Sequence, residues 1–178
     1  MKSLIIIFMA GILVNNYVLQ RFLGICPFLG VSEKPSTALG MGFAVMFVMT
    51  IATICTYLLD NYVLQPLGVQ YLQTISYILV IAALVQMVEI ILKKISPSLY
   101  QALGVFLPLI TTNCTILGVA IMVIQKDMNL LESVVFALST SAGFALALVL
   151  FAGIREQLAL TKLPKGIEGM PTALIVAG

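Results

Sequence analysis

Two of the three cysteines in this sequence stand in near-copies of one short motif. Cys26 begins Cys-Pro-Phe-Leu-Gly-Val and Cys114 begins Cys-Thr-Ile-Leu-Gly-Val, so both stretches follow the pattern C-x-x-L-G-V. Thiolates are the ligands that soft metals and iron–sulfur clusters select. An all-cysteine [2Fe–2S] cluster needs twice as many cysteines as this pair provides, so a cluster here would require a partner chain. The alternative is that both cysteines pack as small hydrophobes.

The third cysteine lies in a different setting. Cys55 is inside an uninterrupted apolar stretch from Thr50 to Thr56, and we predict that it packs as an ordinary side chain. Three cysteines do not indicate a disulfide framework. The sequence contains no histidine, which excludes histidine-based proton transfer or metal binding within this chain.

Polar residues accompany both cysteine motifs inside otherwise apolar segments. Asn15 and Asn16 precede the first motif, and Thr111, Thr112 and Asn113 precede the second. These side chains could bond cluster sulfurs, cap half-helices or coordinate a cation. The alternative is hydrogen bonding between helices, which is common for such residues in membranes.

The carboxylates allow two interpretations. Glu89 and Lys93 are four residues apart, which favours an ion pair on one helix face. Glu89 is also among the carboxylates predicted deepest in the membrane, and such groups often mark ion paths. Four further acids are predicted to lie near the ends of membrane spans and to be solvated: Asp60, Asp127, Glu132 and Glu156.

Composition places these residues in a membrane protein. The chain has 178 residues, of which 61% are hydrophobic and 9% charged, and its mean hydropathy is +1.15. Soluble domains carry about 25% charged residues. The N-terminal apolar segment has one lysine before it and no small-x-small site after it, so it is not expected to be a cleaved signal peptide. The usual nucleotide-binding and nucleophile motifs are absent, and the net charge of +2 does not indicate nucleic acid.

Charge-free runs divide the chain into membrane spans of about 20 residues. Five such spans are predicted, at about 3–23, 37–59, 71–92, 99–124 and 130–154. A sixth apolar run starts at Met170 and is too short to span, so we expect a truncated sixth helix or an interfacial segment. Lysine and arginine number six in the loops after spans one, three and five and two on the opposite side, which predicts an N-terminus outside the cell.

The repeated motif predicts the architecture. Its copies lie in spans one and four, and because an odd number of spans separates them, they enter the membrane from opposite sides. We therefore predict an all-α integral membrane protein with an inverted-topology repeat of three plus three helices, within one membrane domain over 1–178. The first repeat covers about 1–94 and the second about 95–178. Spans one and four should be broken, at Gly24 and Pro27 in the first and at Pro108 in the second.

Longer stretches carry a resemblance to a known family. Residues 13–19, 22–31, 104–114 and 154–156 resemble the A-type subunits of the Rnf complex, which are homologous to the E subunit of the sodium-translocating NADH:quinone oxidoreductase. The resemblance covers nearly the whole chain. It departs from the family at the C-terminus, where the family has a complete sixth helix.

The resemblance implies a specific role. In this family an A-type subunit pairs with a homologous E-type subunit of inverted orientation, and each gives two cysteines to one [2Fe–2S] cluster in the membrane; the matching positions here are Cys26 and Cys114. The complex moves electrons between ferredoxin and NAD with sodium or proton transport, together with iron–sulfur and flavin-bearing subunits. The resemblance further implies the bacterial cytoplasmic membrane, surrounded by lipid.

Two other classes of function stay open from the residues alone. Inverted repeats with broken helices are also typical of secondary transporters, and a purely structural membrane subunit would fit the same hydropathy. Bound iron is the observation that separates these alternatives, because only the electron-carrier interpretation requires it.

Overall fold

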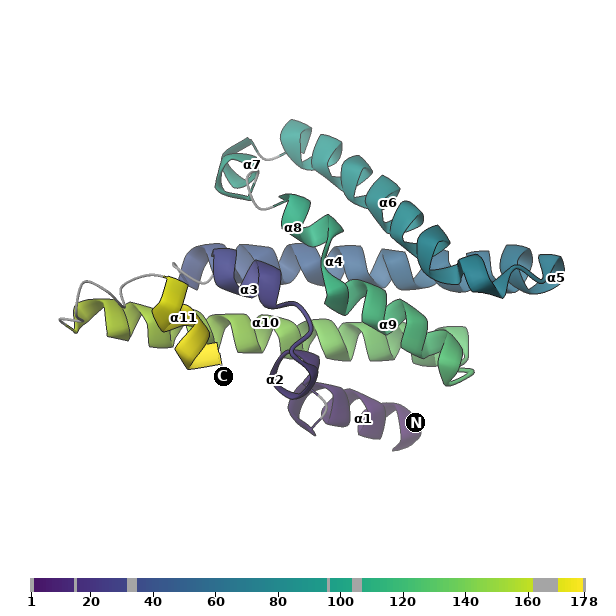
Figure 1. Cartoon of the computed structure of the whole chain (residues 1–178), viewed down its shortest axis with the longest axis horizontal. Helices are drawn as coiled ribbons and strands as arrows, with labels where there is room; N and C mark the ends of the chain where they lie inside the picture. Colours follow the sequence, from purple (N-terminus) through teal and green to yellow (C-terminus); the bar gives the residue numbers. More distant parts are fainter. Residues whose placement is uncertain are drawn as a thin grey trace.

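Two long helices form the centre of the molecule. In the computed structural model, which describes residues 2–14, 16–31, 35–95, 97–103, 107–161 and 170–177, α4 (Pro35–Leu59) and α10 (Leu130–Leu160) run antiparallel along each other (Figure 1). Small residues let them approach closely, since a Cβ added to Gly42 would lie 2.8 Å from the Cβ of Ala145. Small residues at helix contacts are the usual basis of packing in membranes.

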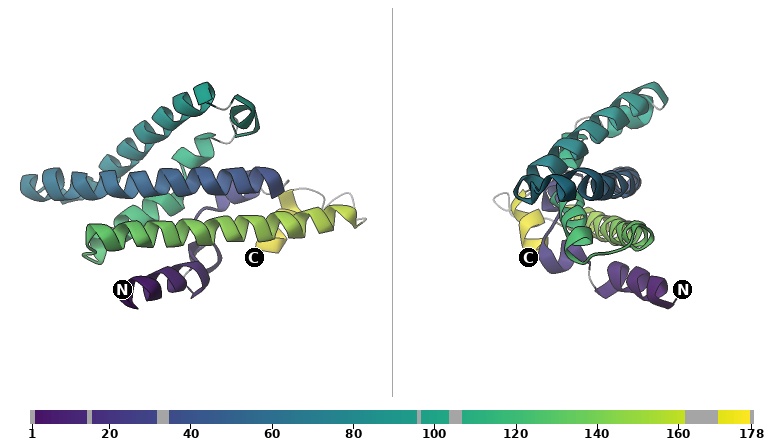
Figure 2. Two further views of the ribbon diagram at one scale, coloured as in Figure 1. Left: turned by 180° about the vertical axis from the view of Figure 1, so that it is seen from behind. Right: turned by 90° about the vertical axis from the view of Figure 1, so that its right-hand side faces the viewer.

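Each half of the chain also contributes an interrupted segment beside this central pair. The first comprises α1 (Lys2–Met9), the π-helix η1 (Ala10–Val14), α2 (Tyr17–Arg21) and α3 (Ile25–Val31). The second comprises α7 (Pro97–Leu103), α8 (Leu107–Thr111) and α9 (Cys114–Gln125). From the middle of the molecule α3 and α9 run toward opposite ends of the bundle (Figures 1 and 2). This arrangement is what the predicted inversion of the two halves requires.

The remaining elements extend or flank the bundle. Helix α4 continues into the π-helix η2 (Asp60–Leu64) and α5 (Gln65–Leu67), and the chain returns through the 3₁₀ turn η3 (Gln70–Leu72) into α6 (Gln73–Ile95). Helix α6 contacts α4, α8 and α9, and the short α11 (Met170–Ala177) contacts α3. Gly68 ends α5 with φ +67°, which a glycine adopts without strain.

The prediction of an all-α integral membrane protein is confirmed. In the described parts of the chain no strand is found, and four helical stretches are long and apolar enough to span a membrane: Pro35–Leu67, Gln70–Ile95, Pro108–Gln125 and Leu130–Leu160. The first predicted span, at about 3–23, is divided among α1, η1 and α2, and α3 follows its predicted end.

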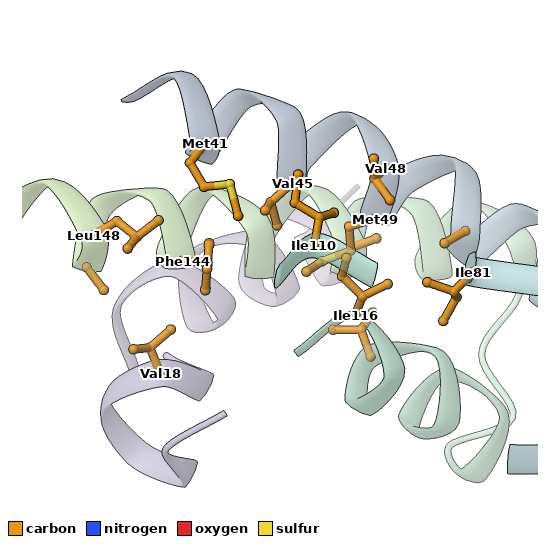
Figure 3. Close-up of a cluster of buried hydrophobic side chains, with 14 of the residues drawn as sticks. Val18, Met41, Val45, Val48, Met49, Ile81, Ile110, Ile116, Phe144 and Leu148 are labelled. Carbon is orange, nitrogen blue, oxygen red and sulfur yellow. The ribbon is translucent and has the colours of Figure 1, made fainter. Parts of the chain in front are cut away.

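The core forms where the second interrupted segment meets α4. Figure 3 shows Ile110 of α8 and Ile116 of α9 among side chains of α4, including Val45 and Met49. All four residues are at most 1% exposed. In a membrane, close van der Waals packing holds helices together, so these contacts hold the two short helices on either side of the second break against α4.

Of the predicted breaks and ends of the spans, one stays untested and one differs from the structure. Span four has a described break at Thr112 and Asn113, and Pro108 is in the first turn of α8. The residues directly before α8, 104–106, lie outside the described ranges, so a break at Pro108 stays a prediction. Span two does not end at Asp60, because the helix continues through η2, and Asp60 is 3% exposed rather than solvated. The prediction of solvation was wrong because the hydroxyl of Tyr77 and Nε2 of Gln65 donate hydrogen bonds to this carboxylate in place of water.

Candidate functional site at the helix breaks

The break between α2 and α3 depends on left-handed backbone. Phe22 has φ +54° and Gly24 has φ +85°, so the chain turns sharply before Ile25 begins α3. This conformation directs the backbone N–H of Gly24 toward the other half of the protein, where it donates a hydrogen bond of 2.9 Å to Sγ of Cys114. The break that precedes the first cysteine motif therefore contacts the first residue of the second motif.

Only glycine fits at position 24. A Cβ added there would overlap the hydroxyl of Thr115 and lie 2.7 Å from Cε2 of Phe144 and 3.3 Å from Oδ1 of Asn113. An L-residue at this φ would also be strained. Close approach of the backbone is what brings the Gly24 amide within reach of the Cys114 sulfur. We call Gly24, Asn113, Cys114 and Thr115 the central junction.

The break between α8 and α9 depends on a side chain. Oδ1 of Asn113 accepts a 2.9 Å hydrogen bond from the backbone N–H of Thr115, which caps the first turn of α9. Upstream, the hydroxyl of Thr112 donates to the carbonyl of Pro108 at 3.1 Å and closes α8. Cys114 is thus the first residue of a new helix, where the positive end of the helix dipole faces its surroundings.

The two predicted ligand residues lie in this region with different exposure. Cys114 is partly buried against Gly24, whereas Cys26, the second residue of α3, is exposed. Gly24 precedes Cys26 by two residues, so chain length alone keeps their backbones within about 7 Å. The exposed thiol of Cys26 and the partly buried thiol of Cys114 can contribute to a ligand set that a neighbouring protein completes. Cys55 is partly buried within α4, in line with a packing role.

The central junction contains buried polar atoms that the described part of the chain leaves without a hydrogen-bond partner. They are Nδ2 of Asn113 and Oγ1 of Thr115; Oγ1 of Thr140 in α10 is a third such atom. Asn113 is 2% exposed and Thr115 is fully buried. Burying a polar group without a hydrogen-bond partner in an apolar medium is destabilising by about 2–7 kcal/mol. Their presence beside Cys114 fits a bound group that accepts hydrogen bonds.

The other predicted polar residues have structural partners. Asn16 accepts from the N–H of Val18 at 3.1 Å and donates from Nδ2 to the carbonyl of Gly143 at 2.8 Å, so it caps α2 and ties it to α10. Thr111 lies at the end of α8 and is partly buried. Asn15 lies outside the described residues.

None of the predicted carboxylates belongs to the central junction. Tyr100 donates to Oε1 of Glu89 at 3.4 Å, and its ring lies 5.8 Å below the Lys93 ammonium, so both residues of the predicted ion pair engage Tyr100. Within the described residues no direct Glu89–Lys93 ion pair is found, because Tyr100 of α7 lies against both side chains. Asp127 and Glu156 are exposed and Glu132 is partly exposed, as predicted.

Asp60 and Tyr77, which are buried, form a separate polar cluster at one end of the bundle with the exposed Gln65 and the partly buried Gln73. Oδ1 accepts from the hydroxyl of Tyr77 at 3.1 Å and Oδ2 from Nε2 of Gln65 at 3.2 Å, while Gln73 donates to the Tyr77 hydroxyl at 3.0 Å. A cavity of about 140 Å³ opens beside it, lined also by Asp127. We call Asp60, Gln65, Gln73 and Tyr77 the Asp60 cluster. It shares no residue with the central junction.

Sequence reasoning did not identify two members of the central junction. The backbone N–H of Gly24 has no signature in the sequence, although the glycine itself was predicted to break the helix. Thr115 was part of the repeated motif, yet its first-repeat counterpart is Pro27, so the comparison of the copies gave it no weight. The close approach of the Thr115 side chain to Gly24 arises only when the two halves pack together.

Comparison with known proteins places this arrangement in a family. Residues 4–178 match the family described as "Rnf-Nqr subunit, membrane protein". The chain is 58% identical over 176 residues to the A subunit of the Na(+)-translocating ferredoxin:NAD(+) oxidoreductase complex from Acetobacterium woodii, covering 99% of this chain and 92% of that protein.

Two further relatives agree. The A subunit of the ion-translocating oxidoreductase complex from Syntrophotalea carbinolica is 58% identical over 178 residues, covering 100% of this chain and 92% of the relative. The protein of the same name from Vibrio campbellii is 50% identical over 178 residues, covering 100% of this chain and 93% of the relative.

Proposed function

This chain belongs to the Rnf-Nqr family of membrane-protein subunits, and from that premise we propose that it is a subunit of an ion-translocating oxidoreductase complex. The names of its relatives carry this step, since those from Acetobacterium woodii, Syntrophotalea carbinolica and Vibrio campbellii are each named as the A subunit of such a complex. Within it the chain acts as a membrane electron carrier. It has no nucleotide-binding or nucleophile motif of its own and depends on the other subunits for donor and acceptor.

The proposed cofactor is a [2Fe–2S] cluster shared with a homologous subunit of inverted orientation. Cys26 and Cys114 supply two thiolates, and the partner supplies the other half of the ligand set. When bound, the cluster carries one electron at a time. Two observations support this: the hydrogen bond that joins Gly24 to the Cys114 sulfur, and the exposure of Cys26 on the surface of the single chain.

The position of the junction suits a relay. The break beside Cys114 lies near the middle of the molecule, between the ends of the two long central helices (Figure 1). A bilayer core is about 30 Å thick, which is too far for a single efficient electron transfer. A carrier held halfway divides that distance. This chain's residues would hold the two thiolates there, with Cys114 partly buried against Gly24.

Electron arrival in a medium of low dielectric constant is unfavourable unless the added charge is compensated. We propose that movement of a cation, sodium or proton, provides the compensation and so couples electron transfer to ion transport. The measurement is reduction of the cluster in sealed vesicles, followed by EPR at varied sodium and proton concentrations. Reduction that is indifferent to both ions would contradict coupling at this site.

The proposed setting is the bacterial cytoplasmic membrane with the N-terminus outside, from the distribution of lysine and arginine. A reporter that is active only in the cytoplasm, fused in the 95–98 segment between α6 and α7, should be active. An inactive fusion that is still inserted in the membrane would reverse the orientation.

Bound iron tests the cluster directly. The chain should be purified together with its partner subunits, and iron and the visible spectrum recorded for the wild type and for Cys26→Ala, Cys114→Ala and Cys55→Ala. We expect either of the first two substitutions to remove the iron and the colour, and Cys55→Ala, the matched control, to retain both. A secondary transporter would be colourless throughout, and loss of iron in Cys55→Ala alone would reassign the ligands.

A further inference from the structure

Two asparagines in this protein make the same backbone contact. Oδ1 of Asn16 accepts from the N–H of Val18 at 3.1 Å, and Oδ1 of Asn113 accepts from the N–H of Thr115 at 2.9 Å. Both side chains are buried, at 5% and 2% exposure. Because the oxygen of each amide is identified by the N–H that it accepts, the nitrogen is identified as well.

The two amides differ in what their nitrogens do. Nδ2 of Asn16 donates to the carbonyl of Gly143, whereas Nδ2 of Asn113 has no partner in the described part of the chain. A helix cap needs only the oxygen, and a serine, threonine or aspartate would cap α9 without burying an unpaired NH₂ group. The amide at position 113 therefore provides a donor beyond what the cap requires.

The chemistry of that donor limits its partner. An amide NH₂ group can donate to an acceptor and cannot coordinate a cation, so a sodium site at this atom is excluded. Asn113 directly precedes Cys114, and the N–H of Gly24 already donates to the Cys114 sulfur. The unpaired hydroxyl of Thr115, immediately after Cys114, is a further donor in the same place. The group that these donors suit is an electron-rich acceptor at Cys114.

We propose that the Asn113 amide and the Thr115 hydroxyl donate hydrogen bonds to the sulfur atoms of the cluster bound at Cys114, and that they raise its reduction potential. The inference rests on the proposed cluster. Reduction adds one electron and no proton, so the negative charge on the sulfurs increases, and donors stabilise the reduced form more than the oxidised form. Asn113 and Thr115 are positioning residues in this scheme, since Cys26 and Cys114 remain the ligands.

The test measures the midpoint potential of the cluster by EPR-monitored redox titration of the purified complex. Asn113→Ser keeps a capping oxygen and removes the NH₂ group. Asn16→Ser is its control, because it makes the same change at the cap of α2. Thr115→Val removes the hydroxyl without changing the branched shape. Thr53→Val is its control, because the buried Thr53 hydroxyl donates to the carbonyl of Met49 within its own helix.

We expect Asn113→Ser and Thr115→Val each to lower the midpoint potential, by about a tenfold change in the reduction equilibrium, or about 59 mV for one electron. The iron content should stay at the wild-type value, and the two control variants should keep the wild-type potential. If Asn113→Ser disturbs folding, Thr115→Val still tests the proposal, since it preserves side-chain volume.

Each result decides between the inference and the function on which it rests. An unchanged potential in both Asn113→Ser and Thr115→Val, with iron retained, would overturn the donor role and leave the cluster standing. Equal shifts in the test and control variants would also overturn it, because they would indicate a general loss of structure. Absence of iron from the wild-type complex would overturn the proposed function and this inference together.

Discussion

The Asp60 cluster and the central junction differ in whether their hydrogen bonds are complete. In the Asp60 cluster both carboxylate oxygens accept hydrogen bonds, and the tyrosine that supplies one of them is itself bonded by Gln73. In the central junction Asn113 and Thr115 each keep one polar atom unpaired. Both regions lie beside an irregular stretch of helix, the π-helix η2 in one and the break before α9 in the other.

The difference indicates different roles. A buried polar network whose members are all paired stabilises one arrangement of helices and needs no ligand. Unpaired buried donors are uncommon, and a cofactor is one partner that can account for them. On this reasoning the Asp60 cluster joins η2 to α6, whereas the unpaired atoms of the central junction fit the proposed cluster.

The largest expected effect comes from adding a methyl group at Gly24, with the same change at Gly68 as the comparison. Gly24→Ala should be strongly destabilising, by about 1–2 kcal/mol for left-handed backbone and about 1–3 kcal/mol for overpacking against Thr115 and Phe144. Gly68→Ala, next to the Asp60 cluster, has the same sign of φ with no atom within 4 Å of the new Cβ, so only the backbone term applies. Thermal unfolding in detergent measures both, and equal losses would contradict the tight packing at Gly24.

An intermediate effect is expected from removing one donor of the Asp60 cluster. Tyr77→Phe leaves Oδ1 of the buried carboxylate without the hydroxyl that it accepts from, which should lower stability by about 1–3 kcal/mol. Tyr62→Phe is the control, since Tyr62 is 74% exposed in η2. The free energy of unfolding is measured for both. A neutral Tyr77→Phe would show that this cluster is not the completed network described above.

The smallest effect should come from the unpaired hydroxyl of the junction. In protein prepared without iron, Thr115→Val removes a buried group that has no partner, so the unfolding temperature should be unchanged or slightly higher. Thr53→Val removes a hydroxyl that is hydrogen-bonded, and it should lower stability by about 1 kcal/mol. A clear loss of stability in iron-free Thr115→Val would mean that its hydroxyl has a protein partner after all.

Much of the site was predictable from local patterns. The matched motifs at Cys26 and Cys114 identified the two segments, and Gly24 was correctly predicted to interrupt the first. The described break before α9 lies at Thr112 and Asn113, because the cap at Asn113 determines where α9 begins. A break at Pro108 stays a prediction, since residues 104–106 lie outside the described ranges. The assignment of Cys26 and Cys114 as cluster ligands stays a prediction.

The sequence by itself determined the class of the protein. Long charge-free runs require helices in a membrane because every backbone polar group must be paired there, and the repeated motif with its flanking stretches indicated the family. Hydropathy and motif spacing are properties of neighbouring residues, and they hold whatever the rest of the chain does.

Only the tertiary structure decided which polar atoms are paired. Gly24 and Cys114 are 90 residues apart in the chain, and their hydrogen bond exists because the two halves pack against each other. The burial of Asp60 depends in the same way on α6 folding back beside η2. Side-chain pairing across helices follows from packing, and packing distinguishes two asparagines that the sequence presents as alike.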